Sequence, residues 1–233
     1  MIKVENIDVW GFEHAIRGMR NPMNSWAKSD SDVAFHALEN FEPNDPMADK
    51  YREWNDKYGL NFKLGPNDLD LMQRLYNAGP EHRKYFRQIF ISLDITAPLY
   101  WWKEFDTYKI GTVSNSCSTM HKIHAKEFDL DDFSHEHLDE GNIVWLAGTV
   151  DRLNTYRKMY VLSKDKDIWW QLIQMLPSSY NQKRTITMNY ENAVTMIRQR
   201  SGHKLDEWNE FVDILKGLPY LSAITEKAGD DHA

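Results

Sequence analysis

The sequence predicts an α+β fold: a helix-dominant single domain with a small antiparallel sheet. Apolar and polar residues alternate over residues 89–96, and a short β-prone stretch lies at 185–188. Helical periodicity covers most of the remaining chain. No internal repeat and no linker divides the 233 residues, and this length can bury a substantial core. We therefore expect one domain over residues 1–225 and a flexible tail at 226–233.

The first quarter of the chain contains a long polar segment. Residues 20–59 are rich in Asn and Asp and predict a surface excursion within the domain, with a short helix near residues 33–38. The first clear helix opens at Asn67, which can cap the amides ahead of Leu69, and it ends at Gly79.

The alternating segment at residues 89–96 predicts a strand with one apolar and one mixed face. Pro98 then stands in the first turn of a helix over residues 99–110. Two further helices are expected over residues 143–160 and 168–176. The remaining predicted elements are a strand at 185–188, a helix from Asn189 to Gly202, and a last helix carrying Trp208, Phe211, Val212 and Leu215.

Composition and charge restrict the functional class. The chain has 28 Lys and Arg against 35 Asp and Glu, a net charge of −7, which argues against binding of a nucleic acid polymer. A single cysteine excludes a disulfide framework and a multi-cysteine metal site. No apolar run is long enough for a membrane span, and the charged start is unlike a signal peptide. We expect a cytoplasmic protein that contacts no membrane.

A group of histidines and acidic residues is spaced as metal ligands can be: His121, His124, Asp129, Asp131, Asp132, His135 and His137. The first two histidines can share a helix face and the last two a strand face. A solvated loop rich in His and Asp has the same composition. We favour the loop interpretation and expect no bound metal.

Residues 87–124 form the most informative run. The predicted strand enters Ala97-Pro98, an aromatic helix follows, and seven of the nine positions 111–119 are Gly, Ser, Thr or Cys. Short donors beside backbone amides can hold a phosphate or the edge of a ring. A Ser/Thr-rich connecting loop is the structural alternative.

Three motif blocks in order carry a family resemblance. With Ala97-Pro98 as the anchor, the pattern R-H-R-x-x-S-x-N-E-x-S-x-R falls on Thr107, Tyr108, Lys109, Thr112, Ser114, Asn115, Cys117 and Thr119. Upstream, His82 falls on the first histidine of G-H-x-S-P-x-E-H. Downstream, Leu176-Pro177 is followed by Tyr180, Asn189 and Arg200 at the family's spacing. The chain resembles the flavin-dependent thymidylate synthases.

This resemblance implies a reaction and a set of ligands. The family moves a one-carbon unit from methylenetetrahydrofolate to the uracil ring of dUMP, with FAD reduced by NADPH, and it assembles as a homotetramer with sites shared between subunits. The implied flavin contacts are His82, Tyr108, Lys109 and Asn189. The implied substrate contacts are Glu104, Asn115, Cys117, Ser118, Thr119 and Arg200, of which Cys117 and Arg200 are the candidate catalytic residues.

The signature is nevertheless degenerate. Thr107 and Thr119 stand where the family has arginine, and Ile173 replaces a substrate arginine. Fewer charge-assisted contacts weaken the binding of a doubly charged phosphate. The cations that can compensate are Lys103, Lys122, Lys183 and Arg184.

Each candidate also has a structural explanation. Cys117 is either a buried, inert thiol or a reactive thiolate. Asn189 can be a helix N-cap, Arg200 a solvated arginine near a helix C-terminus, and His82 a surface histidine. For the whole protein, the alternative to the enzyme is a nucleotide- or flavin-binding scaffold that keeps the fold without the chemistry.

Overall fold

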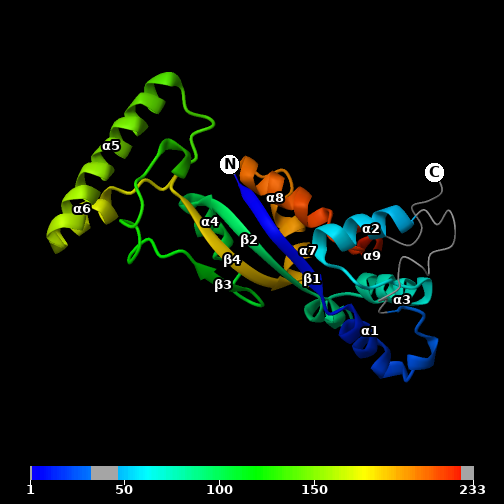
Figure 1. The fold of residues 1–233 in the computed structure, drawn as a ribbon. Helices are drawn as coiled ribbons and strands as arrows, with labels where there is room; N and C mark the ends of the chain where they lie inside the picture. The colour runs from blue at the N-terminus through cyan, green and yellow to red at the C-terminus, as the bar shows by residue number, and fades with distance from the viewer. Residues whose placement is uncertain (1, 33–46, 227–233) are drawn as a thin grey trace.

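Four antiparallel strands form the centre of the molecule (Figure 1), in a computed structural model that describes residues 2–32 and 47–226. The strands are β1 (Lys3–Trp10), β2 (Phe90–Pro98), β3 (Val113–Ser116) and β4 (Asn181–Asn189). Their order in the sheet is β1-β2-β4-β3, and every neighbouring pair is antiparallel. The predicted α+β fold with a small antiparallel sheet is confirmed.

Two strands lie where the sequence does not predict them. In β1 the alternation is broken because Asn6 has a left-handed φ of 51° and the pairing with β2 shifts between Glu5 and Asp8. β3 has the sequence Val-Ser-Asn-Ser, and all four residues are exposed at the edge of the sheet. Because neither face of this strand is buried, its sequence has no alternation of apolar and polar residues. The predicted strand at residues 185–188 is the second half of the longer β4.

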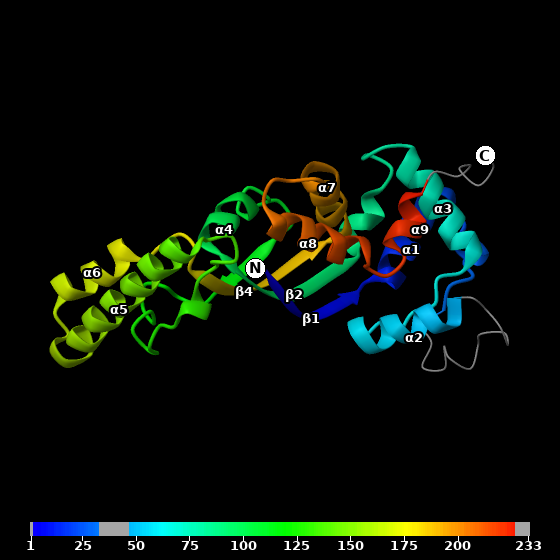
Figure 2. The same ribbon diagram turned by 90° about the horizontal axis from the view of Figure 1, so that it is seen from above.

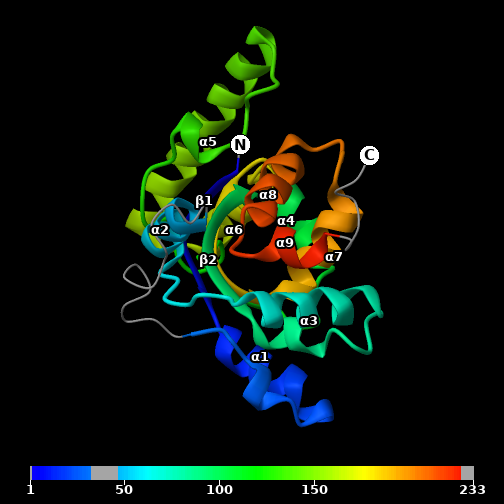
Figure 3. The ribbon, with the colours of Figure 1, turned by 90° about the vertical axis from the view of Figure 1, so that its right-hand side faces the viewer.

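One face of the sheet is covered by α4 (Leu99–Phe105), α7 (Tyr190–Arg200) and α8 (Asp206–Lys216), which lie on its concave side (Figure 3). Alternate residues of β2 point into this layer and are fully buried. Trp101, Trp102 and Trp208 are among the largest fully buried side chains of the core. The predicted helix over residues 99–110 ends early, at Phe105, and the Thr107 hydroxyl donates to the Glu104 carbonyl.

The helices from the first third of the chain gather at one end of the sheet (Figures 1 and 2). They are α1 (Phe12–Arg20), α2 (Met47–Tyr58), α3 (Pro66–Asn77) and the 3-10 helix η3 (Lys84–Gln88), and α9 (Leu221–Thr225) joins them. The predicted excursion over residues 20–59 is wrong for α2, because Tyr51, Trp54 and Tyr58 form a buried stripe at helical spacing. The short helix expected near 33–38 lies outside the described residues.

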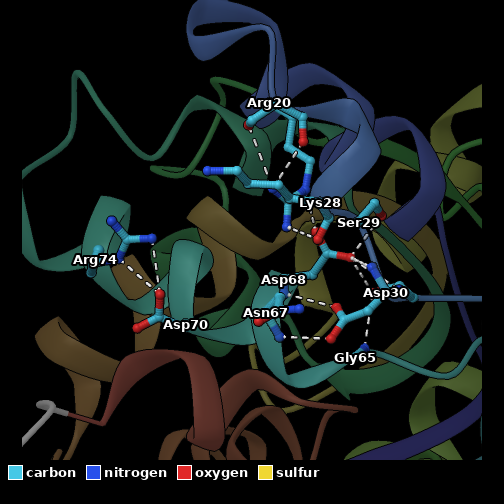
Figure 4. A network of polar contacts seen from close by, with 11 residues as sticks. Arg20, Lys28, Ser29, Asp30, Gly65, Asn67, Asp68, Asp70 and Arg74 are labelled. Atoms are coloured by element: carbon cyan, nitrogen blue, oxygen red, sulfur yellow. Dashed lines mark hydrogen bonds and ion pairs between the residues drawn. The ribbon is translucent and has the colours of Figure 1, made fainter.

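A buried ion pair ties the chain after α1 to α3 (Figure 4). Arg20 Nε donates to Asp68 Oδ1 over 2.6 Å, and its other nitrogens donate to main-chain carbonyls, including that of Lys28. The second Asp68 oxygen accepts from the hydroxyls of Ser29 and Ser31. Burial alone raises the pKa of Asp68, but the bonds from Ser31, Ser29 and Arg20 lower it overall. This part of the expected excursion, which includes η1 (Asn21–Met23) and η2 (Trp26–Lys28), is therefore anchored.

At the opposite end of the sheet, α5 (Glu140–Ser163) and α6 (Lys166–Met175) project as an arm (Figures 1 and 2). Both helices agree with the sequence prediction. With η4 (Leu130–Asp132), the arm has its own apolar cluster: Ile123, Phe128, Phe133, Leu146, Val150, Leu153 and Leu172. The single domain over residues 1–225 stays a prediction. In the described ranges, none of the helices is long and apolar enough to cross a membrane.

Candidate functional site

Three of the predicted site residues meet at the C-terminal end of α7. Arg200, the last residue of α7, donates to Glu104 Oε2 over 2.5 Å and to Tyr108 Oη over 2.9 Å. Glu104 lies in the last turn of α4 and Tyr108 in the loop that follows. The guanidinium lies over the rings of Trp208 and Tyr108, 4.7 Å and 5.6 Å from their centroids. The side chains of Arg200 and Glu104 are 18% and 34% exposed, so this pair reaches solvent.

Two further residues complete this group, which we call the Arg200 cluster: Glu104, Tyr108, Arg200, His203 and Trp208. Leu205 N donates to His203 Nδ1 over 3.1 Å, and Arg200 Nη1 lies 3.1 Å from the other ring nitrogen, His203 Nε2. That nitrogen lies 3.3 Å from Glu104 Oε2, and Trp208 Nε1 donates to the same oxygen over 3.0 Å. His203 is missing from the sequence prediction because a histidine just beyond a helix end has no distinctive pattern.

The Arg200 cluster combines charge with planar surfaces. The Glu104 carboxylate balances the Arg200 charge and accepts from Arg200 and Trp208, so it fixes the direction of the guanidinium. Tyr108 and Trp208 provide aromatic rings beside it. Trp208 is fully buried behind the guanidinium, whereas the Tyr108 ring is half-buried. A guanidinium donor, a carboxylate acceptor and the Tyr108 ring at one partly exposed place can hold a planar group that has both acceptors and donors.

Asn189, a predicted flavin contact, occupies the N-cap of α7. Its side-chain oxygen accepts from Asn192 N over 3.1 Å, and Asn192 Oδ1 accepts from Asn189 N over 3.2 Å, which is a reciprocal capping box. Asn192 Nδ2 also donates to the Ile110 carbonyl over 2.8 Å. Gly111, with a φ of 79°, comes so close that a Cβ there would lie 2.8 Å from Asn189 Nδ2. The structural explanation of Asn189 as an N-cap is therefore confirmed.

The loop at residues 107–112 lies along α7 and connects these two places. Tyr108 contacts the end of α7, and Ile110 contacts its first turn. Lys109, between them, is exposed and has no ion pair within the described residues. The loop therefore brings the Tyr108 and Lys109 positions of the signature beside the helix that carries Asn189 and Arg200.

The remaining signature positions lie along β3 and beyond it: Asn115, Cys117, Ser118 and Thr119. Cys117 is five residue steps beyond Thr112 along extended chain, a span of about 17 Å. The Cys117 backbone bonds to β4, with its N–H donating to the Lys183 carbonyl and its carbonyl accepting from Gln182 Nε2. Its thiol is free and exposed, so the interpretation as a buried thiol is wrong. Cys117 and Arg200 are not in contact in the described chain.

His82, the other predicted flavin contact, lies on the exposed turn between α3 and η3. It borders an open hollow of about 820 Å³ whose lining includes Met19, Met23, Leu75, Lys84, Tyr85 and Gln88. The next residue, Arg83, forms a two-pronged ion pair with Glu191 over 2.9 and 2.7 Å. Glu191 is in the first turn of α7, so the turn that carries His82 is fixed to the helix of Asn189 and Arg200.

The histidine group does not converge. Among residues 2–32 and 47–226, no three His, Cys, Asp or Glu side chains gather as metal ligands do. His124 stands edge-on to Tyr160, and burial and nearby Lys164 lower its pKa. His137 lies beside Asp206, and His135 contacts the Phe133 carbonyl.

Comparison with known proteins now adds to this geometry. A structure titled as flavin-dependent thymidylate synthase ThyX from Helicobacter pylori complexed with FAD and dUMP is 17% identical, with a TM-score of 0.61 over 96% of this chain and 97% of that one. A second ThyX structure from the same organism, also with FAD and dUMP, is 15% identical, with a TM-score of 0.59 and full coverage of both chains. No protein-family model matches the sequence, and no curated protein matches it.

The structural matches define the class of the fold: a helix-dominant α+β chain with one four-stranded antiparallel sheet. More particularly, the chain has the fold of ThyX, the flavin-dependent thymidylate synthase, over its whole length. The fold implied by the degenerate motifs is confirmed.

Proposed function

We propose that this protein is an FAD-dependent enzyme that methylates a pyrimidine deoxynucleotide, dUMP by default, with methylenetetrahydrofolate and NADPH as co-substrates. The observation that carries the proposal is the full-length likeness to ThyX structures holding FAD and dUMP. The local geometry supports it, since four positions implied by the family resemblance lie on or against α7: Glu104, Tyr108, Asn189 and Arg200.

The residues present fit a flavin. The hollow beside His82 has about 820 Å³, within the range of small-molecule sites. Apolar side chains, Tyr85 and the Gln88 amide suit a planar ring with a hydrogen-bonding edge, and Lys84 is a cation for a phosphate. Of the proposed flavin contacts, His82 borders this hollow, and Tyr108, Lys109 and Asn189 lie outside its lining, on or beside α7. When bound and reduced by NADPH, FAD would supply the hydride that the one-carbon transfer requires.

The chain itself would orient the nucleotide. We assign the pyrimidine ring to the Arg200 cluster, where the guanidinium and the Glu104 carboxylate offer donors and an acceptor. Arg200 would stabilise negative charge that develops on the ring. Asn115, Cys117, Ser118 and Thr119 are further proposed substrate contacts. Because β3 carries them away from Arg200 within one chain, sites shared between the subunits of a homotetramer account for their roles.

Turnover of dUMP to dTMP tests the proposal. Purified protein with FAD, NADPH and methylenetetrahydrofolate should produce dTMP, and Arg200→Gln should lower the rate because a donor that stabilises the reacting ring is lost. The matched control is Arg198→Gln, an exposed arginine on the same helix. No product from the wild type with bound flavin would contradict the methylation.

Two observations favour the scaffold alternative. Arg200 is already balanced by Glu104, and arginines are replaced at Thr107 and Thr119. A binding protein tolerates both features, whereas an enzyme acting on a phosphate dianion needs other cations. Flavin binding without rescue of a thymidine auxotroph would support this second function.

A further inference from the structure

Arg184 on β4 has an environment that repeats that of Arg200. Its Nη1 donates to Asp106 Oδ1 over 2.7 Å, and its guanidinium lies 4.1 Å from the centroid of the Trp102 ring. Arg200 in the same way pairs with Glu104 and stacks on Trp208. Asp106 and Glu104 both belong to the C-terminal end of α4. Two arginines therefore flank this end of α4, each held by one carboxylate and one tryptophan.

The position of Arg184 connects it to the proposed substrate segment. In the register of β3 with β4, Ser116 lies opposite Arg184, so the two side chains share a face of the sheet. Ser114, two residues earlier, points to that same face. Arg184 Nε donates to Gln182 Oε1 over 3.0 Å, and Gln182 Nε2 donates to the Cys117 carbonyl over 2.8 Å. Arg184 is thus linked through Gln182 to Cys117 and pairs with Asp106, the residue that precedes the signature.

The hydrogen bonds of Arg184 leave one of its nitrogens as a donor for a ligand. Within the described residues its hydrogen bonds use Nε and Nη1, so Nη2 is available. The stacking on buried Trp102 sets the direction of the guanidinium in advance, and a planar fork suits the oxygens of a phosphate. Asp106 is 49% exposed and can turn into water without becoming a buried lone charge.

We propose that Arg184 binds the phosphate group of the nucleotide, in exchange for Asp106, with the Ser114 and Ser116 hydroxyls as additional donors. The inference rests on the proposed function, in which the pyrimidine ring lies at the Arg200 cluster. It supplies a cation that the motif positions Thr107 and Thr119 have lost. Arg184 is then a specificity-determining residue that distinguishes a nucleotide from a nucleoside.

Calorimetric titration of the flavin-loaded protein with dUMP, deoxyuridine and inorganic phosphate tests this assignment. Arg184→Gln should weaken dUMP binding by about tenfold to a hundredfold, as expected for the loss of one charge-assisted contact, and leave deoxyuridine binding unchanged. Asp106→Asn should have the opposite sign and tighten both dUMP and phosphate, because the competing carboxylate is gone. Arg198→Gln and Asp70→Asn, exposed positions away from Arg184, are the matched controls.

The outcomes separate this inference from the function on which it rests. Equal losses for dUMP and deoxyuridine in Arg184→Gln, or no tightening in Asp106→Asn, would overturn the phosphate assignment while dUMP binding stands. If the wild type binds phosphate through Arg184 but not dUMP, the proposed substrate is wrong and the anion site is retained. If the wild type binds neither, both proposals fail.

Discussion

Two arginine–carboxylate pairs in this molecule have the same chemistry and different surroundings. Arg20 and Asp68 are 4% and 0% exposed, and both are saturated with hydrogen bonds from one continuous polar network. Arg200 and Glu104 are 18% and 34% exposed and lie among Tyr108, His203 and Trp208. The first pair joins segments 48 residues apart, and the second lies where the motif positions converge.

The difference separates a structural ion pair from one that can exchange partners. Breaking a buried pair leaves a lone charge in a medium of low dielectric constant, so its partners are fixed. A pair near solvent costs little to open because water can replace either partner. On this basis the Arg20–Asp68 pair stabilises the fold, and the Arg200–Glu104 pair is available to a ligand.

The largest expected effect is the loss of stability in Asp68→Asn. Removal of the carboxylate charge leaves Arg20 buried without its counter-ion, and the free energy of unfolding should fall by about 3–5 kcal/mol. Urea unfolding followed by circular dichroism measures this change. The matched control is Asp70→Asn in the same helix, where the exposed pair with Arg74 (Figure 4) should be worth less than about 1 kcal/mol. Equal losses of unfolding free energy in Asp68→Asn and Asp70→Asn would contradict the structural role assigned to the buried pair.

In contrast to Asp68→Asn, Arg200→Gln should change the stability of the fold little and the affinity for ligands strongly. We expect the free energy of unfolding to change by less than about 1 kcal/mol, because the pair is partly solvated. The affinities for dUMP and deoxyuridine should both fall by about tenfold to a hundredfold, since the lost contact is to the ring. Calorimetry on the flavin-loaded variant, with Arg198→Gln as the control, measures both ligands. A large loss of stability with intact ligand binding would show that Arg200, like Arg20, stabilises the fold and does not bind the ligand.

The buried pair should also govern the response to acid. The pKa of Asp68 is lowered from its ordinary 3.8, so the unfolded chain binds this proton more readily than the folded chain. The stabilisation is complete above pH 3.8 and is lost as the pH falls through the lower folded-state value. Asp94, whose pKa is lowered to about 2 by hydrogen bonds from Thr185, Asn6 and Lys183, adds to this trend. Unfolding free energies measured against pH should show a shallower acid decline in Asp68→Asn than in the wild type.

The smallest expected effect concerns Cys117. Because the thiol is exposed, a thiol-specific alkylating probe should label the native protein without denaturant. Mass spectrometry at intervals gives the rate, and Cys117→Ser is the control for specificity. Labelling that begins only on denaturation would contradict the exposed position at the end of β3.

The sequence predicts the parts of the fold that depend on local periodicity. The alternation in β2 and the apolar spacing in α5, α6, α7 and α8 follow from burial of one face, and each element lies where the pattern predicts it. β1 is missed because the left-handed Asn6 breaks its alternation. The polar segment before α3 is misjudged because its order depends on hydrogen bonds between Asp68 and residues almost 40 positions away.

The candidate site shows the same limit. The family resemblance implies Glu104, Tyr108 and Arg200 as site residues, and the three meet in the structure. It does not reveal that Glu104 balances Arg200, because the two residues are 96 positions apart. Arg184 has no motif at all, and its environment arises only when β4 passes beside Trp102 and the end of α4.

The proposed function requires this chain, with its ThyX fold, to bind a flavin and a pyrimidine nucleotide together. The most direct measurement is the visible spectrum of the purified protein after incubation with FAD and removal of the free cofactor, before and after addition of dUMP. We expect a yellow protein whose flavin bands shift on addition of dUMP, with the shift weakened in Arg200→Gln. A protein that stays colourless after FAD addition, with its fold intact by circular dichroism, would contradict it.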